Sequence, residues 1–189
     1  MRWLAFPLIV FLVGSASAAD KASGLAAWDR IFEVASHPRC ANCHVGPSDR
    51  PMWTGKSYGA PRVHGMNVRG GESRAGGETL PCAACHGASK TPQNTPHAPP
   101  RVDGVWALAP PEAHWFGQSS QAICAQLRDP KRNGNRTVAD IAAHLDHDKV
   151  LGWAWSPGPG REPAPYSLTA HIEDILAWGA AGQPCPQDP

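Results

Sequence analysis

The sequence predicts a mainly α-helical fold with long irregular loops and little or no β-sheet. Three observations support this fold class. Apolar residues recur at helical spacing in four separate stretches, each of which begins at a serine or threonine that can cap a helix. The stretches between them are rich in glycine and proline, which favour turns and irregular backbone. No stretch alternates apolar and polar residues convincingly enough to predict a sheet.

Residues 1–18 have the features of a secretory signal peptide. A single basic residue, Arg2, precedes an apolar run over residues 3–13, and small residues follow it as far as Ala19. This run is shorter than the roughly 20 apolar residues of a spanning helix. We therefore expect cleavage after Ala18, or after Ala19, and export to the periplasm.

The rest of the chain, residues 19–189, has a length that predicts a single domain. The protein has 17 basic and 16 acidic side chains and a formal net charge of +1. This balance provides neither the basic stripe of a nucleic-acid-binding protein nor a polybasic membrane anchor. No later stretch is long and apolar enough to cross a bilayer, so we expect no membrane span in the mature protein.

Four helices are predicted from their first residues and their apolar positions. Pro38 is expected to end the first helix. In the third, Thr137 and Asp140 form a capping-box pattern, and the helix should run to about His147. The predicted capping residues, in chain order, are Ser23, Ser119, Thr137 and Ser167.

The pentapeptide Cys-x-x-Cys-His occurs twice, at residues 40–44 and 82–86. Three chemistries use such cysteine pairs: a zinc site, a redox disulfide, and the covalent attachment of haem. The gap between the pairs is much longer than in common zinc ribbons, and a thioredoxin-type pair would need a βαβ context that the sequence lacks. Neither zinc nor a disulfide requires a histidine directly after each second cysteine.

Covalent haem attachment accounts for every position of the repeated motif. In these motifs the chain resembles the diheme cytochromes c, and the resemblance implies a compact fold organised around two covalent haem c groups. Long loops, such as residues 69–78, which we expect to be flexible and exposed, suit this fold because porphyrins would fill the interior. The predicted thioether cysteines are Cys40, Cys43, Cys82 and Cys85, and the predicted proximal iron ligands are His44 and His86.

The distal iron ligands do not follow from the motif, and two histidines are the first candidates. His64 lies between the two motifs, where the chain must pass near both haems. It is similar in position to an iron-ligating histidine of the small diheme cytochromes associated with nitrate reductase, although the histidine that those proteins carry upstream of the first motif is missing here. His144 lies on a predicted helix that can hold it rigidly. His114 and Met66 are the alternatives, and methionine would raise the reduction potential.

Residues outside the motifs also have predicted roles. Cys124 and Cys185 lack a neighbouring histidine, and after export a disulfide between them is expected rather than two free thiols. Arg101 and Arg161 are either partners for the carboxylates of the haems or ordinary surface residues. The tryptophans of the loop-rich part either contact porphyrin or belong to the protein core; they are Trp106, Trp115, Trp153 and Trp155.

These features predict an electron carrier rather than an enzyme, with redox proteins as its partners. The fragments HPRCANCH, HGMNV, LPCAACH and GWAWSPGPGREPAP are also similar to proteins labelled as isoquinoline 1-oxidoreductase subunits. That resemblance implies a molybdenum hydroxylase as the electron donor. The alternatives are a diheme peroxidase-like enzyme, although such enzymes are usually much longer, and a haem-based ligand sensor with an open iron site.

Overall fold

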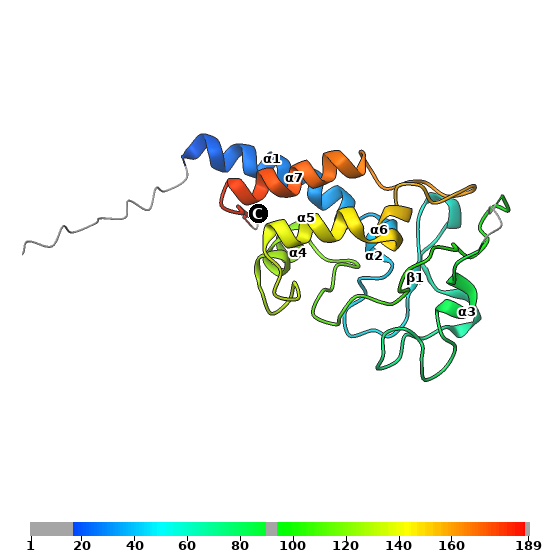
Figure 1. Ribbon diagram of the computed structural model, residues 1–189. Coiled ribbons are helices and arrows are strands. Elements are labelled where there is room, and N and C mark those ends of the chain that lie inside the picture. The colour runs from blue at the N-terminus through cyan, green and yellow to red at the C-terminus, as the bar shows by residue number, and fades with distance from the viewer. Residues whose placement is uncertain (1–16, 90–93, 188–189) are drawn as a thin grey trace, which may run out of the picture.

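The structure is a computed structural model that describes residues 17–89 and 94–187. Helices account for 41% of the residues and strands for 4%, which confirms the mainly α fold class. One part of the molecule is a group of helices that lie side by side, and the other consists of loops with short elements (Figure 1). The helices of the first part are α1 (Ala18–Ala35), α4 (Ser120–Arg128), α5 (Val138–His147) and α7 (Leu168–Ala180).

The loop-rich part contains only short regular elements. Strands β1 (Met52–Trp53) and β2 (Arg62–Val63) pair antiparallel and form the only sheet within the described residues. The prediction of little or no β-sheet is therefore confirmed for this part of the chain. The short helices, which the sequence did not predict, are α2 (Pro38–Ala41), η1 (Lys56–Tyr58), η2 (Gly65–Asn67), α3 (Ala83–His86) and α6 (Lys149–Trp153).

Three of the four predicted helix caps are confirmed. The side-chain oxygens of Ser119, Thr137 and Ser167 each accept a hydrogen bond from a backbone amide in the first turn of α4, α5 and α7. Asp140 completes the capping box of α5 by accepting a hydrogen bond from the amide of Thr137 at 2.9 Å. Helix α5 ends at His147, as predicted.

The prediction that Ser23 begins the first helix was wrong. Helix α1 starts at Ala18, because Ser17 and Asp20 form a reciprocal capping box further upstream. Ser23 lies inside the helix, where its hydroxyl donates to the carbonyl of Asp20 at 2.9 Å. Of the predicted signal peptide, residues 1–16 lie outside the described residues.

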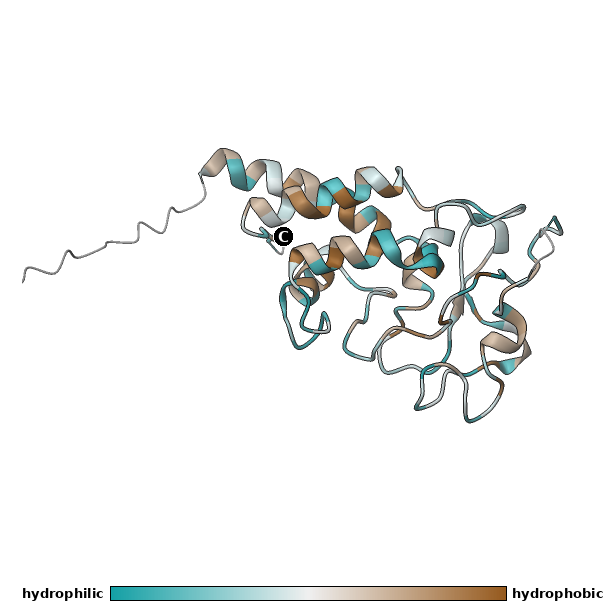
Figure 2. Ribbon diagram, viewed as in Figure 1, coloured by the Kyte–Doolittle hydropathy of each residue, from teal (hydrophilic) through white to brown (hydrophobic). Residues whose placement is uncertain are grey.

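The hydrophobic core lies between the four longer helices. Trp28 of α1 and Trp178 of α7 are fully buried, with ring centroids 5.4 Å apart. Their indole N–H groups are satisfied, since Trp28 donates to the hydroxyl of Ser120 at 2.8 Å and Trp178 to the carbonyl of Pro184 at 2.9 Å. Apolar residues gather where α1, α5 and α7 face one another (Figure 2). The helical part therefore has a core of its own.

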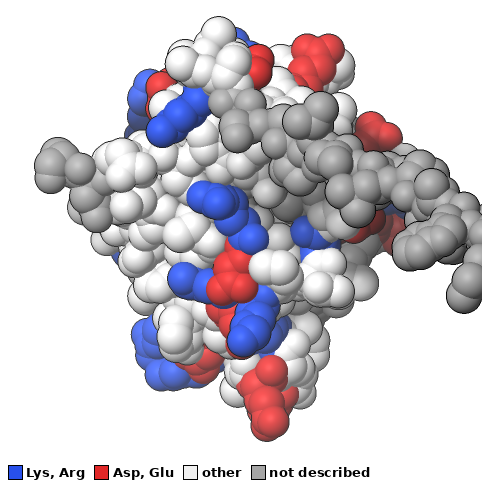
Figure 3. All heavy atoms as spheres, turned by 90° about the vertical axis from the view of Figure 1, so that its left-hand side faces the viewer, with Lys and Arg blue, Asp and Glu red and all other residues white. Residues whose placement is uncertain are grey.

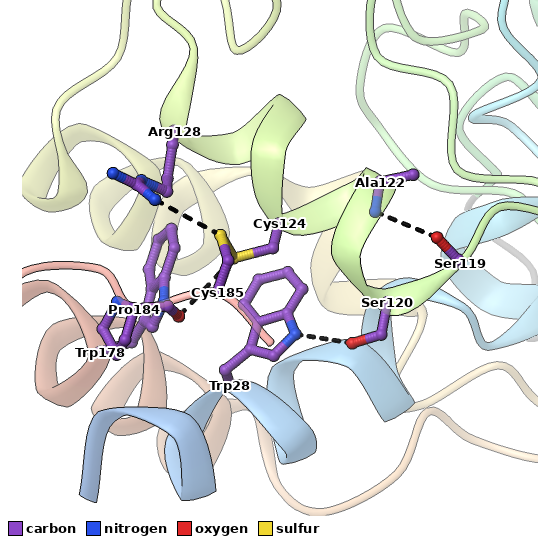
Figure 4. The surroundings of a disulfide bond; sticks show 9 residues. All are labelled: Trp28, Ser119, Ser120, Ala122, Cys124, Arg128, Trp178, Pro184 and Cys185. Atoms are coloured by element: carbon purple, nitrogen blue, oxygen red, sulfur yellow. Dashed lines mark hydrogen bonds between the residues drawn. A yellow bond between two sulfur atoms is a disulfide. The ribbon is translucent and has the colours of Figure 1, made fainter. Parts of the chain in front are cut away.

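A disulfide joins the end of the chain to this core. The sulfur atoms of Cys124, which lies in α4, and of Cys185, which follows α7, are 2.06 Å apart. Figure 4 shows the bridge beside Trp28 and Trp178, the two tryptophans at the centre of the core. The predicted pairing of Cys124 with Cys185 is thus present in the structure, and it closes a loop with a sequence separation of 61 residues.

A salt bridge and mixed surface charges complete the helical part. Asp174 of α7 is buried and accepts hydrogen bonds from the guanidinium of Arg30 on α1, which ties the two longest helices together. Basic and acidic residues are interspersed on the face shown in Figure 3. Every helix within residues 17–89 and 94–187 is too short or too polar to cross a lipid bilayer.

Candidate functional site

Each Cys-x-x-Cys-His motif folds into a single helical turn. The amide of His44 is 3.3 Å from the carbonyl oxygen of Cys40, and the amide of His86 is 3.0 Å from that of Cys82. A helical turn places residues three or four apart on one face, so the two thiols and the histidine of each motif stand close together. Because the sequences that flank the two motifs differ, this shared geometry belongs to the motif itself.

The histidine of each motif is oriented by a backbone carbonyl group. His44 Nδ1 lies 3.2 Å from the carbonyl oxygen of Ala113, and His86 Nδ1 lies 3.1 Å from that of Pro100. A carbonyl oxygen only accepts, so Nδ1 carries the proton and the lone pair of a neutral ring is on Nε2. A hydrogen bond from the non-ligating nitrogen is the usual device that orients metal-binding histidines.

A tryptophan stacks on each of these histidine rings. The centroids of His44 and Trp115 are 3.5 Å apart with planes 7° from parallel, and those of His86 and Trp106 are 4.5 Å apart at 29°. Trp153 contacts Trp106 edge to face, with centroids 5.7 Å apart. The stacking and the carbonyl hydrogen bond together fix both the plane and the rotation of each imidazole. Trp155, by contrast, contacts the ring of His171 on α7, with centroids 5.7 Å apart.

A distant segment wraps around the first motif. The amide of Ala109 donates to the carbonyl of Cys43 at 3.1 Å, and the amides of Trp115 and Phe116 both donate to the carbonyl of His44. Residues 109–116 therefore supply the backbone partner and the stacking partner of the first motif histidine. No sequence signal linked this segment to the motif, because the two are far apart along the chain.

Arg74 fastens the loop that precedes the second motif. Its guanidinium donates to the carbonyl oxygens of Gly46, Ser48 and Ala109, at distances between 2.8 and 3.1 Å. The predicted flexible, exposed loop at residues 69–78 is therefore anchored at its centre, and Gly70 and Gly76 within it are buried. The prediction was wrong at these positions because a glycine-rich composition favours turns without deciding whether a turn packs against the protein.

A cavity of about 260 Å³ lies between the two motifs. The first motif contributes Cys43 to its wall, and the second contributes Cys82, Cys85 and His86. Much of the remaining wall is apolar or aromatic, and it includes Trp53, Leu80, Trp106, Leu108 and Trp153. The two motifs, separated by 37 intervening residues in the sequence, therefore meet at one apolar space.

His64 lines the same cavity as His86. It directly follows β2, and its ring centroid is 6.1 Å from that of His86 with the planes at 62°. Two imidazoles that bind one metal ion from opposite sides, each through a bond of about 2 Å, have ring centroids roughly 6 Å apart. His64 Nδ1 lies 3.0 Å from the carbonyl oxygen of Gly65, so His64 repeats the hydrogen bond of the motif histidines. The spacing fits a metal ion held between His64 and His86.

His144 is the histidine whose charge affects His44. It lies on α5, and its charge adds a small contribution to the low pKa of His44, which comes mainly from burial. Its side chain is 43% exposed, and its Nδ1 is 3.9 Å from a carboxylate oxygen of Asp148. His147, one turn further, is 78% exposed and lies beside Asp146. Of the two α5 histidines, His144 is therefore the better candidate for the distal ligand beside the first motif.

The two alternative distal ligands occupy less suitable positions. Met66 lines the rim of the cavity but is 80% exposed, at a left-handed backbone position with φ of 60°. His114 pairs with Val45 in an isolated β-bridge, and its ring packs so closely on Gly46 that a Cβ there would lie 2.5 Å away. Neither side chain faces a motif histidine as His64 faces His86.

Burial keeps the groups of the first motif uncharged. It lowers the pKa of His44 to about 3 and raises the pKa values of Cys40 and Cys43 to about 12 and 11. Burial also lowers the pKa of His86. At pH 7 the imidazole of His44 and the thiols of Cys40 and Cys43 are therefore uncharged.

The described residues contain no compact cluster of potential metal ligands. Within the described part of the chain, no three or more His, Cys, Asp or Glu side chains surround a common point in the way that a bare metal ion requires. A porphyrin leaves only the two axial positions of its iron for the protein, so a histidine pair is the set of side chains that haem iron needs.

No protein-family profile, curated protein or solved structure matches the chain.

Proposed function

We propose that the protein is a periplasmic electron carrier that binds two haem c groups covalently and passes single electrons between redox partners. The observation that carries this proposal is the duplicated local geometry of the Cys-x-x-Cys-His motifs. In each, one helical turn presents two thiols, a backbone carbonyl orients the histidine, and a tryptophan stacks on its ring. Three features that recur around both motifs support a common role.

The side chains divide into two binding sets. A bound haem supplies an iron that takes up and releases one electron, at a potential that depends on its axial ligands and surroundings. The carbonyl oxygens of Ala113 and Pro100 hold each proximal imidazole in the tautomer that leaves Nε2 free. The proposed sets are Cys40, Cys43, His44 and His144 for the first haem, and Cys82, Cys85, His86 and His64 for the second.

The position of the two motifs supports transfer between the haems. Cys43 of the first and Cys82 of the second line the same cavity, and the charge of Cys82 contributes to raising the pKa of Cys43. Attachment points this close favour short distances between the cofactors. Much of the wall between them is apolar, which favours a small reorganisation of the protein when charge moves. Redox proteins are the proposed partners, with a molybdenum hydroxylase as the electron donor on sequence similarity.

Cysteine substitutions test the proposal directly. The full chain is produced with periplasmic haem-attachment machinery, treated with acidified organic solvent, and weighed by mass spectrometry. The native protein is expected to retain two haems. The Cys40→Ala/Cys43→Ala and Cys82→Ala/Cys85→Ala variants should each retain one. The Cys124→Ala/Cys185→Ala variant is the matched control and should retain both, because these sulfur atoms bond to each other.

The same preparation separates the proposal from its alternatives. A colourless protein, or pigment that the solvent removes, would refute haem attachment altogether. The partial exposure of His144 favours one other reading, in which the first iron keeps an open position. Rapid binding of carbon monoxide to the reduced, folded protein would then indicate a ligand sensor, and turnover of peroxide would indicate a peroxidase-like enzyme. Two low-spin haems that are inert to both reagents are the result expected of a carrier.

A further inference from the structure

Arg39 lies beside the space between the two motifs and carries two buried hydrogen-bond donors without a partner among the described residues. It precedes Cys40 and lines the cavity. Its Nε and Nη2 atoms are buried, and no hydrogen-bond acceptor among the described residues contacts them. The guanidinium carbon lies 5.3 Å from the centroid of the Trp153 ring. The aromatic contact supports the cation but does not replace a hydrogen-bond acceptor.

Buried donors without partners are costly, which makes this arrangement informative. A buried polar group that lacks a hydrogen bond destabilises the folded state, and a charged group does so more strongly. Native proteins contain few such groups, and each one calls for an explanation. A guanidinium presents its donors in a planar fork that matches a carboxylate. Arg39 is therefore suited to bind an anion.

A second arginine reaches the same cavity from a distant part of the chain. The guanidinium of Arg161 lies 5.9 Å from the centroid of Trp153, the ring that Arg39 also approaches. Its Nε donates to the hydroxyl of Tyr58 at 3.0 Å, and its Nη2 donates to the carbonyl of Ala98. These bonds hold Arg161 in place in the wall of the cavity. Arg101, the other arginine suggested by the sequence, is exposed and does not line this space.

The other charged groups nearby do not neutralise both arginines. Glu162 is close enough for the charge of Arg39 to lower its pKa, but its oxygens accept hydrogen bonds from the amide of Lys56 and the hydroxyl of Ser57. Arg39 and Arg161 both line the cavity, and within the described residues neither forms a salt bridge with a carboxylate.

We infer that Arg39 and Arg161 bind the propionate carboxylates of the haem attached to the second motif. This inference rests on the proposed function, since it concerns the cofactor of the cavity lined by Cys82, Cys85 and His86. Arg39 adjoins the first motif in the sequence, so it would couple the two sites: a residue next to one attachment point holds the cofactor of the other. An apolar cavity with two arginines in its wall suits a haem, which combines a flat apolar ring with two propionate anions.

Charge-removing substitutions test this assignment in the haem-loaded full chain. The variants are Arg39→Gln, Arg161→Gln and the conservative Arg39→Lys. Arg128→Gln, on the exposed residue beside the disulfide, is the matched control (Figure 4). The readouts are the propionate bending band in resonance Raman spectra and the midpoint potential of each haem. We expect both glutamine variants to shift the propionate band and to lower the potential of one haem, because removal of a nearby cation favours the ferric form. Arg39→Lys should restore most of the potential, and Arg128→Gln should change neither readout.

Each outcome has a separate meaning. An unchanged propionate band in both glutamine variants that carry two covalent haems would overturn the assignment and leave the carrier function standing. A shift of equal size in Arg128→Gln would overturn it as well. Absence of covalent haem from the native protein would instead refute the proposed function. Should Arg39→Gln fail to mature, the Arg39→Lys and Arg161→Gln variants still decide the question, since both readouts apply to them.

Discussion

At the scale of single residues, hydrogen-bond partners distinguish histidines that the sequence presents as equivalent. The chain has nine histidines. His44 and His86 share a carbonyl partner at Nδ1 and a stacked tryptophan, which is the environment of an oriented ligand. His171 on α7 is more deeply buried than these two half-buried histidines, but within the described residues its Nδ1 atom lacks a partner. Histidine therefore occurs in this molecule both as an oriented, hydrogen-bonded side chain and as a buried side chain with an unpaired nitrogen.

The buried His171 should make the stability of the protein depend on pH. Burial lowers its pKa from 6.5 to about 4, against a smaller opposing effect of Asp174. The unfolded chain then binds more protons between pH 4 and 6.5, so the free energy of unfolding should rise with pH across this window and level off above it. The shift corresponds to roughly 3 kcal/mol over the window at about 1.36 kcal/mol per unit of pKa.

Replacement of His171 tests this pH dependence of the free energy of unfolding. His171→Leu removes the titrating group and the unpaired nitrogen, so it should reduce the slope of the profile between pH 4.5 and 6.5 and cost little stability at pH 7. Urea unfolding at several pH values follows the effect. His147→Leu, at an exposed site on α5, should retain the native profile. Equal slopes in the native protein and in His171→Leu would contradict the explanation.

At the scale of elements, short local signals explain the parts that the sequence predicted well. The caps at Ser119, Thr137 and Ser167 depend on contacts within three residues, and all three helices begin where predicted. The two motif turns are equally local, although the sequence did not predict them as helices. The first helix was misplaced at its start because two capping patterns compete there, and Ser17 with Asp20 forms the stronger one.

The positions of His64, directly after β2, and of His144, on α5, predict that each residue coordinates the iron of one haem. His64→Ala and His144→Ala should each convert one haem from low-spin to high-spin, because an axial nitrogen is lost while the proximal ligand remains. Absorption and paramagnetic resonance spectra measure the change. Met66→Leu and His147→Ala alter the neighbours of these residues on the same elements and should leave both haems low-spin. Unchanged spectra in His64→Ala would assign the distal position of the second haem to another residue.

At the scale of the whole molecule, the two parts are stabilised in different ways. The helical part has a close-packed core that contains Trp28 and Trp178, the Arg30–Asp174 pair and a disulfide. The loop-rich part surrounds a cavity and is tied together by hydrogen bonds from side chains such as Arg74. We therefore expect the stability of the helical part and the binding of haem to be separable by mutation.

Removal of the disulfide should test this separation. The Cys124→Ala/Cys185→Ala variant loses a crosslink that spans 61 residues of sequence, and a loss of roughly 2–4 kcal/mol in the free energy of unfolding is expected. Denaturant unfolding monitored by circular dichroism measures it. The visible spectrum of the haems should stay unchanged in the folded variant. A changed haem spectrum would show that the two parts depend on each other.

The sequence by itself determined three of the four helix caps, the positions of the two Cys-x-x-Cys-His motifs and the pairing of the two remaining cysteines, because each depends on local spacing or on residue chemistry. Only the tertiary structure decided which groups surround the motifs. The carbonyl partner of His44 lies 69 residues away and that of His86 lies 14 residues away. The tertiary fold also brings His64 close to His86. It likewise brings Arg39 and Arg161 to the ring of Trp153. Such contacts carry no periodic signal in the sequence, since they arise where irregular loops cross rather than within a helix or strand.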